Sequence, residues 1–247
     1  MPPQDKQRLD LALLDRGLAP SRQRARAMIM AGKISVNNQR TDKPGASVTP
    51  ADSIALIGED IPYVSRGGLK LERALEAFDI RVEGYTCLDV GASTGGFTDC
   101  LLQHGAATVY AVDVGYGQFA WSLRNDPRIM LFERTNIRNL AIEKVPSPVD
   151  IAVIDVSFIS LKIVVPVILK FLKTKATVAA LIKPQFEVGK GKVGKGGVVK
   201  DPLQHQSVID TLTAFFEQLN FTVQPVIPSP IKGPKGNTEF LIAMTYQ

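Results

Sequence analysis

Two lysines and two carboxylates stand beside apolar segments in this sequence. Lys183 follows the run ATVAALI, Asp155 follows VDIAVI, and Glu239 directly precedes FLIAM. Lys70 lies in RGGLKLERAL, near the start of a segment with helical periodicity. If the apolar runs are strands of one sheet, the topology brings all four side chains to the same face.

Such a group of charges could act on a hydroxyl. A hydroxyl is a poor nucleophile at neutral pH, so transferring a group to it calls for a residue that removes its proton. A lysine can do this when its amine is partly neutral, a state that burial or a second nearby cation favours. Taken singly, each residue could equally form an ordinary ion pair at a strand end. As a set, they favour catalysis.

The stretch DVGASTGGF, residues 89–97, has the composition of a nucleotide-binding turn. A carboxylate ends an apolar strand, and glycines that let a ligand approach the backbone precede a helix. Asp113 ends the next apolar strand, where a carboxylate can accept hydrogen bonds from a ribose diol. Alternatively, Asp89 only caps the helix and the glycines only form the turn. The candidates for cofactor contact are Asp89, Gly91, Ser93, Thr94, Gly95, Gly96, Phe97, Asp113, Asn136 and Asp155.

Two other nucleotide-binding motifs fit less well. The dinucleotide pattern G-x-G-x-x-G is missing from the turn at 89–97; it occurs at 189–194, in a loop rich in lysine and glycine with no helix after it. The same loop approaches the phosphate-binding P-loop, but Gly196 stands where Ser or Thr would hold magnesium.

The elements that carry these residues alternate between strand and helix from about residue 68 onward. Strands apolar on both faces, separated by helices, predict a doubly wound, mainly parallel α/β sheet of seven strands. The last two strands are joined by the loop PSPIKGPKG without a helix, which predicts an antiparallel hairpin at one edge.

A smaller basic α+β unit precedes this sheet. Between residues 16 and 43 there are seven basic side chains and one acid, Asp42. A helix that stops at Gly17, a second helix capped by Ser21, and a strand turning at Asn37-Asn38 are predicted there. The basic side chains could form a solvated helix face or a surface for nucleic-acid phosphates. The candidates for RNA contact are Arg22, Arg24, Arg26, Lys33 and Lys43.

Composition excludes several classes of protein. The net charge of +5 and pI of about 9.2 suggest an anionic partner, though weakly. With 2 Cys and 2 His in the chain, neither a disulfide framework nor a metal site is expected, and a reducing cytoplasm is the expected compartment. No apolar run reaches the roughly 20 residues that span a bilayer, so no membrane association is expected.

Two resemblances add to these inferences. Residues 7–58 resemble the S4-like RNA-binding domain through the Ser21-Arg22 helix start, GKISVN and the Lys43-Pro44-Gly45 loop. The motif at 89–97 with Asp113 and the terminal hairpin resembles class I S-adenosylmethionine-dependent methyltransferases. The sequence Asp155-Val-Ser-Phe158 lacks the prolines typical of amino-nitrogen methyltransferases, and neither Cys87 nor Cys100 is placed as the nucleophile of a carbon-5 methyltransferase. Oxygen is therefore the favoured acceptor.

Lys70, Asp155, Lys183 and Glu239 together resemble the Lys-Asp-Lys-Glu tetrad of the 2′-O-ribose methyltransferases related to FtsJ. With the S4-like domain, the chain resembles the TlyA (hemolysin A-like) rRNA methyltransferases through VSRGGLKLERAL, LDVGASTGGFTD, DVSFISL, LIKPQFEVG and GNTEFL. The resemblance implies that Lys183 is the base or steers the 2′-hydroxyl, that Lys70 holds the acceptor ribose, and that the two acids orient the lysines. It also implies S-adenosylmethionine as cofactor, and cytidine in ribosomal RNA of ribosomal subunits as substrate.

The resulting domain prediction is an S4-like domain at 1–60, a linker at 61–67 and a methyltransferase domain at 68–247. The lysines of the glycine-rich loop, Lys190, Lys192, Lys195 and Lys200, could overhang the acceptor site as a basic lid or form an ordinary surface loop. The alternatives are a non-catalytic RNA-binding or ribosome-assembly factor and, less favoured, a membrane-lytic haemolysin.

Overall fold

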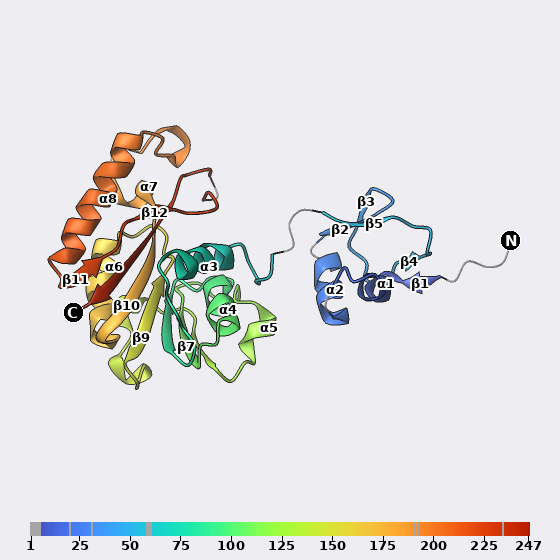
Figure 1. The fold of residues 1–247 in the computed structure, drawn as a ribbon, viewed down its shortest axis with the longest axis horizontal. Coiled ribbons are helices and arrows are strands. Elements are labelled where there is room, and N and C mark those ends of the chain that lie inside the picture. The colour runs from blue at the N-terminus through green and yellow to red at the C-terminus, as the bar shows by residue number, and fades with distance from the viewer. Residues whose placement is uncertain are drawn as a thin grey trace. The chain divides into compact units, whose positions relative to one another are not determined.

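The computed structural model describes residues 6–247 except 20, 31, 58–60, 190, 192 and 234. The chain divides into two compact units, residues 1–60 and residues 61–247. Both units are drawn as ribbons in Figure 1, and each is described here by itself.

The first unit packs two helices against short antiparallel strands. Helices α1 and α2 share a buried core that includes Leu9, Leu13 and Ile29. The strand order is β3-β2-β5, and β1 pairs separately with β4. The elements are β1 (Gln7–Arg8), α1 (Leu9–Asp15), α2 (Arg22–Met30), β2 (Ile34–Val36), β3 (Gln39–Thr41), β4 (Ser47–Val48) and β5 (Ile54–Leu56).

Local chemistry sets the ends of these elements as the sequence predicts. Gly17, just past α1, takes a left-handed φ of 67°, which glycine adopts at little cost. The Ser21 hydroxyl accepts a hydrogen bond from the Arg24 N–H at 3.1 Å, as an N-cap does. Asn37 and Asn38 both have positive φ, the geometry of a tight turn between β2 and β3.

The second unit is built on one sheet of eight strands, counting the short β12. The strand order is β11-β13-β10-β9-β6-β7-β8, with β12 also paired to β13. Strands β8, β7, β6, β9 and β10 are parallel, and β13 runs antiparallel between β10 and β11. The strands are β6 (Thr86–Val90), β7 (Thr108–Val112), β8 (Ile129–Phe132), β9 (Val149–Ile154), β10 (Leu172–Ile182), β11 (Phe221–Val223), β12 (Ile227–Pro228) and β13 (Phe240–Tyr246).

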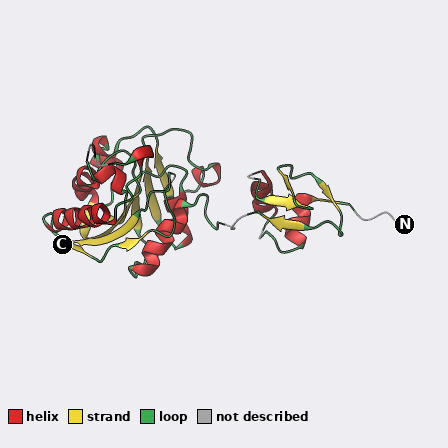
Figure 2. Ribbon diagram, turned by 90° about the horizontal axis from the view of Figure 1, so that it is seen from above, coloured by secondary structure: helices red, strands yellow, loops and turns green. Residues whose placement is uncertain are grey.

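Helices cover both faces of this sheet (Figures 1 and 2). Helices α6 and α8 bury residues such as Val164 and Phe216 against one face, and α3, α4 and α5 bury residues such as Leu71 and Leu101 against the other. The predicted doubly wound α/β fold with an antiparallel edge is confirmed. The helices are α3 (Gly67–Ala77), α4 (Gly96–Gln103), α5 (Trp121–Arg124), α6 (Leu161–Ile168), α7 (Pro184–Glu187) and α8 (Pro202–Glu217), with 3-10 turns at Ile137–Asn139, Ile142–Lys144, Leu169–Phe171 and Lys195–Gly197.

The segment expected to be a linker, 61–67, is packed into the second unit instead. Tyr63 is 4% exposed, and its hydroxyl donates to Glu72 Oε1 at 2.7 Å. The Val64 N–H donates to Asp99 Oδ2 on α4 at 2.8 Å. The reason for the difference is that a buried aromatic ring and two hydrogen bonds fix this Gly/Pro-rich stretch, and α3 already begins at Gly67.

Among the residues that the structure describes, none of the helices is both long enough and apolar enough to span a bilayer.

Candidate active site

The four charged residues singled out from the sequence lie together at one edge of the sheet. Asp155 directly follows β9, Lys183 follows β10, Glu239 directly precedes β13, and Lys70 lies in the second turn of α3. The carboxyl ends of β9 and β10 meet there because the two strands are parallel, and β13 starts at the same edge because it is antiparallel to β10.

Three ion pairs join the four side chains. Lys70 Nζ lies 2.7 Å from Glu239 Oε2 and 4.0 Å from Asp155 Oδ2. Lys183 Nζ lies 2.7 Å from Asp155 Oδ1. Asp155 thus links the two lysines, and two ammonium groups face two carboxylates in a formally neutral set.

The pair of Lys70 and Glu239 is the more deeply buried. Glu239 is 1% exposed and Lys70 is 8% exposed. Burial removes the water that would stabilise each charge, and a close partner of opposite charge offsets that loss. Each side chain therefore fixes the position of the other. Glu239 Oε1 has no hydrogen-bond partner within the described part of the chain, and it lies where a side chain on Gly233 would clash.

A cavity of about 550 Å³ opens beside this set, at the ends of β6, β7 and β9. It is lined by Asp113 and Asn136 on one side and by Asp155, Ser157 and Phe158 on the other. A second cavity of about 240 Å³ adjoins it and reaches Lys70. Gly91, Ser93 and Asp155 line both cavities, so an elongated ligand could extend from one into the other.

Asp113 presents an oriented carboxylate to the larger cavity. Its Oδ2 accepts from the Ser93 N–H at 2.7 Å, and its Oδ1 accepts from the Gly115 N–H at 2.6 Å and from Gln118 Nε2 at 3.1 Å. A carboxylate fixed in this way at the end of the second strand suits the hydroxyls of a ribose. Asn136 lines the same cavity, and its side-chain oxygen accepts from the Arg138 N–H at 3.0 Å.

Gly91 allows two strand ends to approach each other in the glycine-rich turn. Its φ is 89°, and a Cβ at this position would lie 2.5 Å from the Asp155 carbonyl oxygen. Any side chain would therefore push apart the turn after β6 and the residue that pairs with Lys183. Ser93, Thr94, Gly96 and Phe97 from the same turn line one or both cavities.

Asp89 and Gly95, which the sequence also placed at the cofactor, line neither cavity. The Asp89 side chain is enclosed between β6 and α4, where its Oδ2 accepts from the Thr98 hydroxyl at 2.6 Å. Burial raises the pKa of Asp89 to about 7. Gly95 has a φ of 92° just before α4, and a Cβ there would meet Leu123 at 2.8 Å. Both residues therefore shape the glycine-rich turn without lining either cavity.

The sequence arguments missed four residues that the fold brings to the site. Lys183 Nζ donates to the Ser157 hydroxyl at 2.9 Å. Phe158 is 90% exposed with a φ of 64°, and its ring lies 5.0 Å from that of Phe186. Ser65 and Arg66 line the smaller cavity. The motifs VSRGG and DVSFISL contain these positions. The motifs supported the family resemblance, but they did not indicate a role for these individual side chains.

The basic residues of the first unit have differing surroundings. Arg22 Nε donates at 3.0 Å to the buried Asp10, which also pairs with Arg8, and these hydrogen bonds, that from Arg8 foremost, lower the pKa of Asp10 to about 2. Arg26 and Lys43 are exposed, whereas Arg24 and Lys33 are partly buried. Arg22 thus has a structural partner as well as an exposed side chain.

The predicted basic lid can be described only in part. Lys190 and Lys192 and the side chain of Lys195 lie outside the described residues, and Lys200 is exposed. The cysteines are free and buried, and burial raises the pKa of the Cys87 and Cys100 thiols to about 12, which suits core residues better than nucleophiles. In the described ranges, no three His, Cys, Asp or Glu side chains are grouped as metal ligands.

Comparison with family models matches both units. Residues 63–246 match the FtsJ-like methyltransferase model, and residues 7–54 match the S4 domain model.

Similar proteins cover nearly the whole chain. The "16S/23S rRNA (cytidine-2'-O)-methyltransferase TlyA" of Mycobacterium tuberculosis is 46% identical over 97% of this chain and 90% of its own. "Hemolysin A" of Brachyspira hyodysenteriae is 41% identical over 95% of this chain and 98% of its own. The solved structure "Putative hemolysin from Streptococcus thermophilus" is 42% identical, with a TM-score of 0.76 over 99% of this chain and 90% of that one.

Proposed function

Because the chain belongs to the FtsJ-like methyltransferase family and carries an S4 domain before the catalytic unit, we propose that it transfers a methyl group from S-adenosylmethionine to a ribose 2′-hydroxyl of RNA. The substrate we propose is cytidine in ribosomal RNA, which is the substrate given in the name of the 46% identical TlyA protein.

The observation that carries this proposal is the position of Lys183. Its Nζ lies 2.7 Å from Asp155, which lines both cavities, and 2.9 Å from the Ser157 hydroxyl, which lines the larger one, although Lys183 itself lines neither. A hydroxyl oxygen that reaches the cavity wall formed by Asp155 and Ser157 would approach a lysine amine already oriented by these two partners. Orientation of this kind is the main contribution that a protein can make to such a transfer.

The residues of the tetrad then have distinct tasks. Lys183 orients the 2′-hydroxyl and, in its neutral form, accepts the proton as the oxygen–carbon bond forms. The Asp155 carboxylate stabilises the ammonium that results. Lys70, held by Glu239 at 2.7 Å, can donate a hydrogen bond to the acceptor ribose and so fix its position.

The two cavities fit the proposed cofactor in size and in chemistry. S-adenosylmethionine supplies an electrophilic methyl group bonded to a sulfonium. Asp113 and Asn136 would hold its adenosine part in the larger cavity, and the turn with Gly91, Ser93 and Thr94 would hold its amino-acid part near Lys70. Closely approaching backbone at Gly91 is what such a ligand requires at this turn.

The first unit would deliver the RNA. Arg22, Arg24 and Arg26 project from the same helix, α2, and basic side chains on one helix suit phosphate contacts. Phe158 would contribute at the catalytic unit, because an exposed aromatic ring beside a ribose site can stack on an unpaired base.

The experiment that tests the proposal is methyl transfer to ribosomal subunits. The full chain is incubated with S-adenosylmethionine labelled in the methyl group and with unmodified 30S and 50S subunits, and the modified positions are mapped by primer extension and mass spectrometry. The expected result is label on a cytidine 2′-oxygen, lost in Lys183→Ala.

The matched control is Lys173→Ala, since Lys173 lies on the same strand and pairs with Asp150 at the opposite end. This variant keeps full activity. If the cofactor binds and no label enters RNA, the chain is a non-catalytic RNA-binding or assembly factor. If Lys183→Ala methylates as fast as the unchanged protein, the role given to Lys183 is wrong.

A further inference from the structure

Two adjacent corners of the sheet carry two of the four tetrad residues, Asp155 and Lys183. The first, residues 155–160, joins β9 to α6, and the second, residues 183–187, consists of Lys183 and helix α7 directly after β10. They contact each other through the Lys183–Asp155 ion pair, through the hydrogen bond from Lys183 to Ser157, and through the rings of Phe158 and Phe186.

A further connection between the corners comes from Glu187, the last residue of α7. Its Oε2 accepts from the Ser160 hydroxyl at 2.6 Å, and its Oε1 accepts from the Leu161 N–H at 2.8 Å. Ser160 is the N-cap of α6, and its hydroxyl oxygen accepts from the Lys162 N–H at 3.1 Å. One carboxylate from the second corner therefore completes the cap of the helix that follows the first.

We propose that Glu187 is a positioning residue that holds the two corners in register, so that Lys183 stays aligned with Asp155 and with the acceptor hydroxyl. This inference rests on the proposed function for its catalytic consequence. Glu187 contacts none of the four tetrad residues by an ion pair or a hydrogen bond in the described part of the chain, so it acts through the backbone of the two corners.

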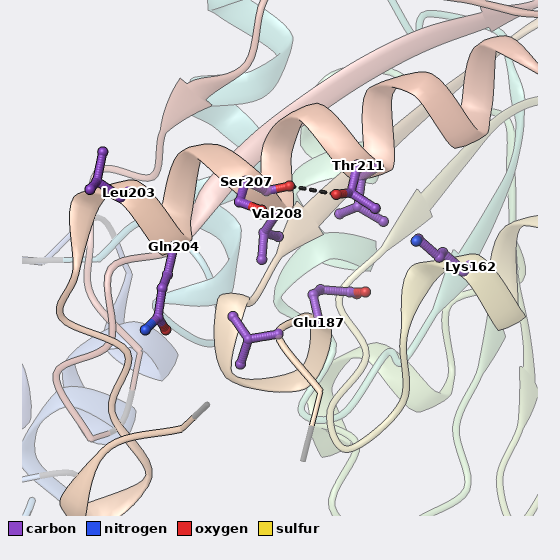
Figure 3. A pocket seen from close by; sticks show the side chains of 9 residues that line it. Lys162, Glu187, Leu203, Gln204, Ser207, Val208 and Thr211 are labelled. Carbon is purple, nitrogen blue, oxygen red and sulfur yellow. Dashed lines mark hydrogen bonds between the residues drawn. The ribbon is translucent and has the colours of Figure 1, made fainter. Parts of the chain in front are cut away.

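The geometry suits a carboxylate in particular. Both oxygens accept from donors at the beginning of α6, where a negative charge is also favoured by the helix dipole. Glu187 follows Lys183 by four residues, and α7 between them is a single short turn that transmits a shift of one end to the other. The Glu187 side chain extends toward the segment that carries Lys162 (Figure 3).

The side of Glu187 away from the site faces a cavity of about 280 Å³ between α6, α7 and α8. Ser207, Thr211 and Lys162 line this cavity, but Glu187 forms no described ion pair with Lys162. The carboxylate therefore has room to move unless the contacts with Ser160 and Leu161 fix it.

The test compares Glu187→Ala with Glu187→Gln and with a control at the start of β9, the strand that leads into the first corner. Glutamine keeps one acceptor for the Leu161 N–H, and its amide can donate to the Ser160 oxygen, so the bridge is retained without the charge. The control is Asp150→Ala, which removes the hydrogen bonds that Asp150 accepts from the Thr86 N–H and from Lys173 Nζ.

Two measurements are made on the full chain, well below the melting temperature of each variant. The first is methyl transfer to ribosomal subunits, separated into kcat and KM for S-adenosylmethionine and for RNA. The second is the acetylation rate of individual lysines by acetic anhydride, followed by mass spectrometry, which reports the environment of Lys183 without any need for catalysis.

In Glu187→Ala, kcat is expected to fall roughly 10- to 100-fold, the loss that a displacement of about 1 Å produces, with smaller changes in KM. Acetylation of Lys183 is expected to rise while that of Lys173 does not change. Glu187→Gln recovers kcat to within about threefold of the unchanged protein, in keeping with the retained bridge. In Asp150→Ala, acetylation of Lys173 is expected to rise and that of Lys183 to stay unchanged, with kcat equal to that of the unchanged protein.

Unchanged kcat and unchanged Lys183 acetylation in Glu187→Ala would overturn the inference. So would equal losses of kcat in Glu187→Ala and Asp150→Ala, which would indicate general destabilisation. If Glu187→Ala does not fold, Ser160→Ala, which removes one of the two contacts together with the cap hydrogen bond from the Lys162 N–H, is judged by the same readouts. If the unchanged protein methylates no RNA, the proposed function fails, and the acetylation pattern alone decides the role of Glu187.

Discussion

Replacing Lys70 by methionine should destabilise the second unit through the charge that it leaves behind. The ammonium lies 2.7 Å from Glu239 Oε2, and both residues are buried. At an effective dielectric constant of about 20, unit charges at that distance attract by roughly 6 kcal/mol. Part of this is offset by the cost of burying the ions, and removal of one partner of a buried pair typically costs about 3–5 kcal/mol.

The measurement is a double-mutant cycle of Lys70→Met and Glu239→Gln, followed by thermal and denaturant unfolding. For a unit of this size, a loss of about 3–5 kcal/mol lowers the melting temperature by roughly 6–20 °C. The double variant, in which neither charge remains, should recover to within about 2 kcal/mol of the unchanged protein. Methyl transfer, in contrast, is expected to be lost in Lys70→Met and also in the double variant, because both lack the ammonium that holds the ribose.

Lys173→Met serves as the control, because its pair with Asp150 is partly exposed and should be worth at most about 1 kcal/mol. Two results would refute the reasoning. One is a loss below about 1 kcal/mol in Lys70→Met; the other is a double variant whose loss equals the sum of the two single losses. Recovery of methyl transfer in the double variant would instead show that Lys70 only balances charge.

Three further predictions concern cofactor binding, the hydrogen bond that orients Lys183, and the dependence of stability on pH. Asp113→Ala should weaken S-adenosylmethionine binding by roughly 10-fold or more in calorimetry, because the ribose would lose a charged acceptor worth about 1.5–3 kcal/mol; unchanged affinity would remove Asp113 from the site. Ser157→Ala should lower kcat modestly, with cofactor affinity retained, because Lys183 Nζ loses its hydrogen bond at 2.9 Å. Burial raises the pKa of Asp89 to about 7. Between about pH 4 and pH 7, the folded chain therefore holds a proton on Asp89 that the unfolded chain has released. The free energy of unfolding should therefore fall as pH rises across that interval, and Asp89→Asn should show a smaller decline in melting temperature; equal slopes for both proteins would contradict this.

Short-range chemistry in the sequence was sufficient for several elements. The stop at Gly17, the cap at Ser21 and the turn at Asn37-Asn38 depend on the conformational preferences of those residues themselves, and the structure has all three. The parallel sheet followed from strands apolar on both faces. The meeting of Lys183 and Asp155 followed in turn, because carboxyl ends of adjacent parallel strands share one edge.

The direction in which a side chain points at a strand end could not be predicted from local sequence chemistry. Asp89 and Asp113 both stand at the ends of neighbouring strands, yet Asp113 faces the cavity and Asp89 faces Thr98 beneath α4. The difference is one of position along the strands: Asp89 lies inside β6, paired with Ala111 and covered by α4, whereas Asp113 lies two residues further along, past the end of β7. The burial of Tyr63 was missed for a related reason: its contact with α3 depends on tertiary packing, whereas Gly and Pro nearby suggested only a flexible linker.

Because the charges of the tetrad cancel, the residues that attract RNA electrostatically are expected to differ from the residues that catalyse methyl transfer. Two ammonium groups and two carboxylates within a few ångströms cancel, so this group exerts little long-range field on an approaching polyanion. The dependence of RNA affinity on salt concentration should therefore reflect counterions displaced elsewhere, above all around α2. Each phosphate contact made there contributes a slope of about −0.7 to −0.9 in log K against log salt, and the catalytic group contributes almost none.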